Sequence, residues 1–226
     1  MIIDMTEIKP SADSCESHQQ SSRPYHHGDL RKELLCAARE MLEDGTIASM
    51  SLRAVAKKVG VSHTAPYRHF KDKEELLAGI AAIGFNRLTA RMAAAVAAHP
   101  GDPAGQMQEA GYQYVKLALE NPPCVQLMFG DILPCDDTYP ELKQAGEEAF
   151  NGLKTIIVEG QSLGVFKPGD IELLALTTWS GIHGLTLLLV GGNLPDILSK
   201  DIDNRDITFA VTSAMLDGLM APPSTS

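Results

Sequence analysis

Apolar residues recur at helical spacing over most of this chain, and the pattern predicts an all-α protein. The first amphipathic segment begins at Gly28 or Asp29 and ends at Leu42, before an Asp-Gly pair. Its apolar positions fall at i, i+4 and i+7 or i+8, so one face of a helix is apolar. These positions are Leu30, Leu34, Leu35, Ala38 and Leu42.

Residues 51–73, SLRAVAKKVGVSHTAPYRHFKDK, predict two short helices separated by a turn at Gly60. The second helix is expected from His63 to Phe70, with Ser62 as its N-cap. Two short helices joined by a turn that contains glycine form a helix-turn-helix motif, which binds DNA. The alternative is an ordinary helical hairpin whose basic residues form a solvated face.

A third helix of about 26 residues follows, from Lys73 to about Ala98, or roughly 39 Å at 1.5 Å per residue. Asp72 precedes it as N-cap, with Glu75 in the matching capping position. Gly79 and Gly84 lie in its interior, where each costs about 1 kcal/mol relative to alanine. They mark either flexible points or sites of close packing against the first helix. A helix of this length is long enough to connect two domains.

Proline, glycine and asparagine breaks divide the remaining chain into further helical segments. The segment from Asp170 to Val190 is apolar nearly all round, so we expect it to be buried within its domain and against a partner. The last segment also carries apolar residues on more than one face. Together they predict a four-helix dimer interface, with two helices from each subunit. The expected segments are 103–120, 124–130, 140–163, 170–190 and 204–220.

The net charge of −10 argues against binding to nucleic acid, but the charge is unevenly distributed. Residues 23–73 hold ten Lys and Arg against six acidic residues, a net charge of +4, so the rest of the chain carries −14. A positive end on an acidic body confines DNA binding to that end. One such end should bind weakly, so specific affinity requires a pair.

The order VSHTAPYRHFKDKEELL after SLRAVAKKVG closely resembles the tetracycline-repressor (TetR) family of bacterial regulators. The resemblance covers residues 25–85 in register. Outside residues 25–85, the resemblance rests on chain length, helix count and a W-x-x-x-H-G element found in one subgroup of the family. It implies a helix-turn-helix DNA-binding domain (25–85, motif 51–70) and a ligand-binding and dimerisation domain (86–226). Residues 1–24 are rich in Ser, Gln and acidic residues, and this composition predicts a disordered tail. About nine helices are expected.

Several residues of the motif match positions that contact DNA in this family. Arg53 matches a position that reaches a base edge or a phosphate. Tyr67 and His69 match contacts to the DNA backbone, and Lys73 matches a phosphate-binding lysine. Pro66 stands where the family usually has Leu or Ile. The full set of expected DNA contacts is Arg53, Ser62, His63, Thr64, Ala65, Tyr67, Arg68, His69 and Lys73.

The W-S-G-I-H-G element places Trp179 and His183 four residues apart, on one helix face. They are candidates for a ligand pocket with an aromatic wall and a titratable group. The alternative is a buried tryptophan and a core histidine that support helix packing. The other pocket candidates are Tyr112, Met128, Phe129 and Phe150, and beside them Met107 and Tyr114.

The sequence shows no sign of a metal or cofactor site. Cys15, Cys36, Cys124 and Cys135 have no C-x-x-C spacing, so free thiols are expected. The first 24 residues lack a basic region and an apolar core, and no later segment offers 18 uninterrupted apolar residues. A cytoplasmic protein without membrane segments is therefore expected.

These features favour a homodimeric, sequence-specific transcription regulator, a repressor that a small molecule releases from a palindromic DNA operator. Two alternatives stay open. One is an architectural DNA-binding protein without an effector. The other is a helical enzyme that uses His183 and nearby acids, although no catalytic arrangement of nucleophile and base is apparent.

Overall fold

The computed structural model describes residues 30–43, 45, 47–134, 137–194 and 202–220, in which eight α-helices and two short 3-10 helices occur. The all-α prediction is confirmed, with eight α-helices described where about nine helices were expected. The α-helices are α1 (Leu30–Glu43), α2 (Leu52–Val59), α3 (Lys73–Ala98), α4 (Pro103–Glu120), α5 (Pro122–Phe129), α6 (Pro140–Ser162), α7 (Ile171–Val190) and α9 (Asn204–Leu219). The 3-10 helices are η1 (Ile47–Ser49) and η2 (Ala65–Arg68).

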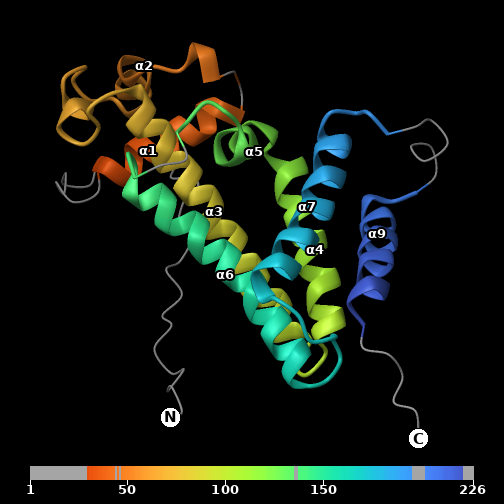
Figure 1. Ribbon diagram of the computed structural model, residues 1–226. Coiled ribbons are helices and arrows are strands. Elements are labelled where there is room, and N and C mark those ends of the chain that lie inside the picture. The colour runs from red at the N-terminus through yellow and green to blue at the C-terminus, as the bar shows by residue number, and fades with distance from the viewer. Residues whose placement is uncertain (1–29, 44, 46, 135–136, 195–201, 221–226) are drawn as a thin grey trace, which may run out of the picture.

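Helix α3 is the central element of the fold. It packs against α1, α4, α5 and α6, and Figure 1 shows it running from the end that holds α1 and α2 into the helical body. Its bounds agree with the predicted ones. The Asp72 side chain caps it by accepting a hydrogen bond from the Glu75 amide at 2.9 Å.

The two interior glycines of α3 are sites of close packing. A Cβ atom on Gly79 would lie 2.7 Å from Cδ2 of Leu35, in α1. On Gly84 it would lie 2.6 Å from Sδ of Met128, in α5. The first glycine therefore lets α1 approach α3, and the second lets α5 approach it, which extends the predicted packing to a second helix.

The first helix buries the predicted apolar stripe. Leu34, Ala38 and Leu42 are fully buried, and Leu30 and Leu35 nearly so. The expected start at Gly28 or Asp29 and the expected disordered tail lie outside the described residues. Two contacts join α1 to the body of the protein. Arg31 pairs with Glu141 of α6 at 2.6 Å, and Glu43 accepts a hydrogen bond from Asn121 at 3.0 Å.

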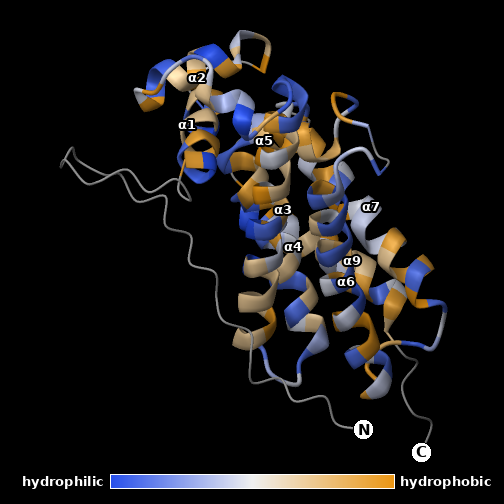
Figure 2. Ribbon diagram, turned by 90° about the vertical axis from the view of Figure 1, so that its left-hand side faces the viewer, coloured by the Kyte–Doolittle hydropathy of each residue, from blue (hydrophilic) through white to orange (hydrophobic). Residues whose placement is uncertain are grey.

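Helices α4, α6, α7 and α9 form the body below α1 and α2. Helix α7 packs on α4, α6 and α9. Along the helices, hydrophobic and hydrophilic residues alternate around the axis (Figure 2), as expected for amphipathic helices that share one core. Among the described helices, α7 alone has the length and composition that could cross a membrane.

Candidate nucleic-acid interface and ligand pocket

The turn between α2 and η2 is built from local signals in the sequence. Ser51 caps α2 by accepting a hydrogen bond from the Ala54 amide at 3.2 Å. Gly60 ends the helix with φ of +80°, a left-handed conformation that favours glycine, and its amide bonds to the Ala56 carbonyl. Val61 then packs against the core. The predicted helix, turn and inward valine are confirmed.

The second helix of the motif differs from the prediction. Instead of an α-helix from His63 to Phe70 capped by Ser62, the chain forms one 3-10 turn, Ala65–Arg68, after a turn at His63 and Thr64. The Ser62 hydroxyl bonds to the Thr64 hydroxyl at 3.1 Å rather than to a backbone amide. Pro66 lies in the first turn of this segment and has no N–H to donate, which is consistent with the short element.

The residues expected to contact DNA lie at one end of the molecule and differ in exposure. Tyr67 has 52% of its surface exposed, so its ring and hydroxyl are accessible to a partner. Ala65 and His69 are half-buried, so they present less surface to a partner. The residues of the set that are exposed are Arg53, Ser62, His63, Thr64, Tyr67 and Arg68.

Lys73 has a partner within the protein. Its Nζ donates to the carbonyl oxygen of Ile47 at 2.6 Å, which ties the start of α3 to η1. An intramolecular carbonyl therefore accounts for a lysine at a helix N-terminus, where the helix dipole disfavours it. The ammonium group has two further protons for another acceptor.

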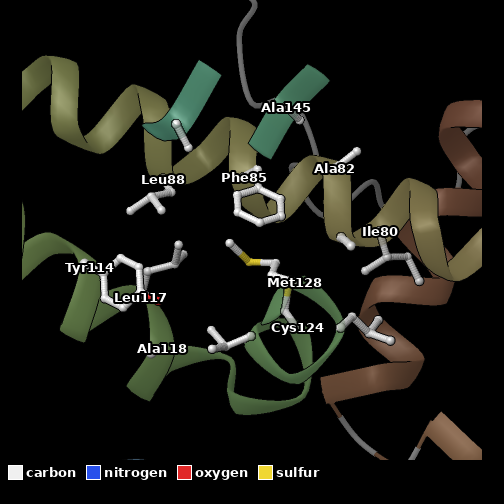
Figure 3. Close-up of a cluster of buried hydrophobic side chains, with 14 of the residues drawn as sticks. Ile80, Ala82, Phe85, Leu88, Tyr114, Leu117, Ala118, Cys124, Met128 and Ala145 are labelled. Atoms are coloured by element: carbon white, nitrogen blue, oxygen red, sulfur yellow. The ribbon is translucent and has the colours of Figure 1, made fainter. Parts of the chain in front are cut away.

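A cavity of about 270 Å³ lies in the body of the protein, between α3, α4, α5, α6 and α7. Its lining is almost wholly apolar and contains no charged side chain. Figure 3 shows part of this region, with Phe85 and Leu88 of α3 facing Tyr114 of α4. The lining residues are Phe85, Leu88, Met92, Met107, Ala110, Gly111, Tyr114, Phe129, Gly146, Ala149, Phe150, Leu153, Thr178, Trp179 and Ile182.

Three of the six principal pocket candidates line this cavity: Phe129, Phe150 and Trp179. They form a continuous aromatic wall, since the ring centroid of Trp179 lies 5.8 Å from that of Phe129 and 6.3 Å from that of Phe150. Met107 and Tyr114, named beside them, also line it.

The other three candidates lie elsewhere. Tyr112 faces α9, where Arg205 stacks 4.7 Å from the centre of its ring. Met128 packs into the core beside Gly84. His183 lies behind the wall, with its ring centroid 5.6 Å from that of Trp179.

Sequence reasoning missed the small residues that leave the cavity open. Ala110 and Gly111 on α4, and Gly146 and Ala149 on α6, line it. The adjacent pair Ala110 and Gly111, and the pair Gly146 and Ala149 three positions apart, are the signal that was available, although small residues on helices are also typical of close helix packing.

Tyr114, Trp179 and His183 form a hydrogen-bonded group at the cavity. The Tyr114 hydroxyl lies 2.7 Å from Nδ1 of His183. Burial raises the pKa of Tyr114 well above its usual range, an effect that a hydrogen bond from Trp179 partly opposes. Burial also lowers the pKa of His183, which favours the neutral imidazole. In the tautomer with its proton on Nε2, the ring accepts a hydrogen bond from the Tyr114 hydroxyl at Nδ1.

The outer face of α7 is apolar and exposed. Leu173, Leu176, Leu187 and Leu188 have between 46% and 62% of their surfaces exposed. In α9, which packs against α7, Ala210 and Ala214 are exposed as well. Exposed large hydrophobic residues that share a helix face are typical of a protein–protein interface.

The cysteines show no reactive thiol among the described residues. Cys124 is free and buried, and burial raises its pKa to about 11, which disfavours the reactive thiolate. Cys36 is disulfide-bonded, contrary to the expectation of free thiols. Cys15 and Cys135 lie outside the described residues.

A helix-turn-helix unit at one end of an all-helical body defines the class of DNA-binding transcription regulators. The model for bacterial regulatory proteins of the tetR family matches residues 34–80. The model for the tetracyclin repressor-like C-terminal domain matches residues 107–215. The chain belongs to the TetR family of transcriptional regulators and carries its DNA-binding motif.

Several known proteins share the fold of this chain or part of its sequence. The chain is 32% identical, over 88% of its length and 100% of the other chain, to a Rhodococcus sp. RHA1 protein of unknown function, with a TM-score of 0.77. A regulatory protein of the tetR family from Rhodococcus RHA1 shares the fold, with 22% identity, a TM-score of 0.61 and coverage of 85% and 97%. The uncharacterized HTH-type transcriptional regulator YobS of Bacillus subtilis (strain 168) is 32% identical over 95 residues, 42% of this chain. That match spans 49% of YobS.

Proposed function

We propose that this regulator is a homodimeric repressor, which leaves a palindromic operator when a small molecule occupies the apolar cavity. The observation that carries the proposal is the path of α3. This helix lines the cavity with Phe85, Leu88 and Met92, and at Gly79 it packs directly on α1 of the DNA-binding domain. A ligand that changes the position of α3 would therefore change the position of that domain.

The proposed domains follow the predicted limits, with residues 25–85 as the DNA-binding domain and 86–226 as the ligand-binding and dimerisation domain. This boundary falls inside α3 (Lys73–Ala98). A continuous helix across a domain boundary transmits a rigid-body movement better than a loop does. We also propose that Trp179, Ser180, His183 and Gly184 belong to the W-x-x-x-H-G element of a subgroup, and that the protein is cytoplasmic.

The proposed DNA contacts divide into two roles. The exposed side chains of Arg53, His63 and Thr64 read base edges, helped by Ser62, Ala65 and Arg68. Tyr67, His69 and Lys73 bind phosphates. Lys73 does so with the two ammonium protons that are not donated to the Ile47 carbonyl. Six of the nine residues are exposed, Ala65, His69 and Lys73 are half-buried, and all nine lie at the basic end of the chain, which supports DNA contact there.

Selection from random DNA duplexes tests sequence specificity. A palindromic consensus is expected, because the two DNA-binding domains of a dimer lie about one turn of the DNA helix apart, roughly 34–36 Å, and contact related half-sites. Tyr67→Phe should weaken binding at all sequences, whereas Arg53→Ala should change preference at defined positions. Uniform binding without a consensus would favour an architectural DNA-binding protein instead.

The proposed dimer interface is the exposed leucine face of α7 together with α9. Light scattering of the double variant Leu176→Glu/Leu187→Glu should give a monomer with operator binding lost, although every DNA contact remains. Val158→Glu is the matched control, since Val158 is 46% exposed on α6, outside the interface. A dimeric double variant would place the interface elsewhere.

Release by a ligand is a shift between two arrangements of the DNA-binding domains. The ligand must bind the arrangement that does not fit DNA more tightly than the one that does. Operator affinity measured with and without a bound pocket ligand tests this. An unchanged affinity at saturating ligand would contradict the proposal.

A further inference from the structure

The polar atoms of the cavity are its most specific feature, because so few of them exist. Among the lining residues, three side chains carry a nitrogen or oxygen atom: Tyr114, Thr178 and Trp179. All lining residues lie in helices, where most backbone groups are already hydrogen-bonded. The hydrogen-bonding character of the cavity therefore depends on one indole and two hydroxyl groups.

The protons of these three groups are already committed. The Thr178 hydroxyl donates to the Leu174 carbonyl at 2.8 Å. The indole N–H of Trp179 can only donate, and it lies close enough to the Tyr114 oxygen to lower the pKa of that hydroxyl. We assign His183 the tautomer with its proton on Nε2, so Nδ1, 2.7 Å from the Tyr114 oxygen, accepts the Tyr114 proton. What the side chains offer to a ligand is hydroxyl oxygen, which accepts hydrogen bonds.

The same lining disfavours a charged ligand. An ionised ligand would lose its hydration and find no side chain of opposite charge, and an unpaired buried charge is strongly unfavourable. Aromatic faces attract cations, but that gain is smaller than the cost of desolvating one in an apolar cavity. The volume of about 270 Å³ lies at the low end of small-molecule pockets, roughly 300–1,000 Å³.

We propose that the cavity binds a small, uncharged, mainly apolar compound of one or two rings with a hydrogen-bond donor, such as a hydroxyl or N–H group, which meets the oxygens of Tyr114 and Thr178. The ligand class rests on the proposed function of the cavity as the effector site. The aromatic wall of Phe129, Phe150 and Trp179 holds the rings.

A matched series of compounds tests the class on the full-length protein. The probes are 4-cyclohexylphenol, its methyl ether, 4-cyclohexylbenzoate and (4-cyclohexylphenyl)trimethylammonium, measured by isothermal titration calorimetry. Quenching of Trp179 fluorescence reports the location, because the chain has one tryptophan and it lines the cavity. The phenol should bind about 3–10-fold more tightly than the ether, the gain of one neutral hydrogen bond. Both ions should bind at least about 100-fold more weakly than the phenol.

Variants locate the acceptors. In the double variant Tyr114→Phe/Thr178→Val, the preference for phenol over ether should fall to about one, because both oxygens are gone. Tyr112→Phe is the control, since that tyrosine lies in the same helix but packs against α9. It should keep the full preference. Circular dichroism and ether binding check that each variant is folded.

Several results would overturn the proposal. They are binding of the benzoate or the ammonium compound as tightly as the phenol, equal binding of phenol and ether, a preference that survives in the double variant, or no binding of any probe. Failure of the proposed function looks different. In that case the phenol binds as expected and quenches Trp179, but operator affinity does not change.

Discussion

Replacing Asn121 by alanine should lower the stability of the protein, because its side chain connects α1 of the DNA-binding domain to α5. Asn121 lies between α4 and α5 with 4% of its surface exposed. Its Oδ1 accepts from the Cys124 amide at 3.1 Å, and its Nδ2 donates to Oε1 of Glu43 at 3.0 Å. Glu43 is the last residue of α1, and α5 ends at Phe129 in the cavity wall.

The size of the effect follows from these two hydrogen bonds. Loss of an asparagine N-cap costs about 0.5–2 kcal/mol, typically about 1. A hydrogen bond to a carboxylate contributes about 1.5–3 kcal/mol when buried, but Glu43 is exposed, so we take about 1 kcal/mol. The free energy of unfolding should fall by about 2 kcal/mol, and Tm by about 4–8 °C for a chain of this length.

Calorimetry of three variants separates the two contributions. Asn121→Ala loses both. Asn121→Asp keeps the cap but places a second carboxylate beside Glu43, so it should also be destabilised. Adding Glu43→Gln to Asn121→Asp removes the repulsion and restores a hydrogen bond, so stability should return. The reasoning is refuted if Asn121→Ala melts within about 1 °C of the wild type, or if Asn121→Asp is as stable as wild type without the second change.

Three further predictions concern packing, the motif and pH. Gly84→Ala should lower the free energy of unfolding, measured in urea, by about 1 kcal/mol, because the clash of the new Cβ atom with Met128 outweighs the helix preference of alanine. Gly152→Ala is the control and should be neutral or stabilising, because the nearest side-chain atom would lie 3.7 Å from its Cβ atom. Lys73→Met should cost about 1 kcal/mol through the lost bond to a backbone carbonyl; an unchanged urea midpoint would show that this bond contributes nothing. Burial lowers the pKa of His183, so below about pH 6.5 the unfolded chain takes up a proton before the folded one. Stability should therefore fall from pH 7.5 to 5.5, and His183→Gln should reduce that fall.

Local signals in the sequence predicted the helix-turn-helix unit well. Ser51, Gly60 and Asp72 act through hydrogen bonds to residues three or four positions away, so the pattern of the chain is enough to place them. The second helix of the motif is the exception. Helical spacing from His63 to Phe70 did not show that the segment, with Pro66 in its first turn, forms only a 3-10 turn.

The cavity depended on tertiary structure. Tyr112 and Tyr114 stand two positions apart on α4, which is roughly 200° around the helix, and neighbours cover both sides. Periodicity showed that both tyrosines are on a helix, but only the packing of α3, α5, α6 and α7 put Tyr114 at the cavity and Tyr112 against α9. Except for the second helix of the motif, the sequence by itself determined where helices begin and end and which positions are apolar, because those interactions span a few residues. Which apolar faces meet, and where small residues leave a space between them, depends on contacts between segments distant in the chain.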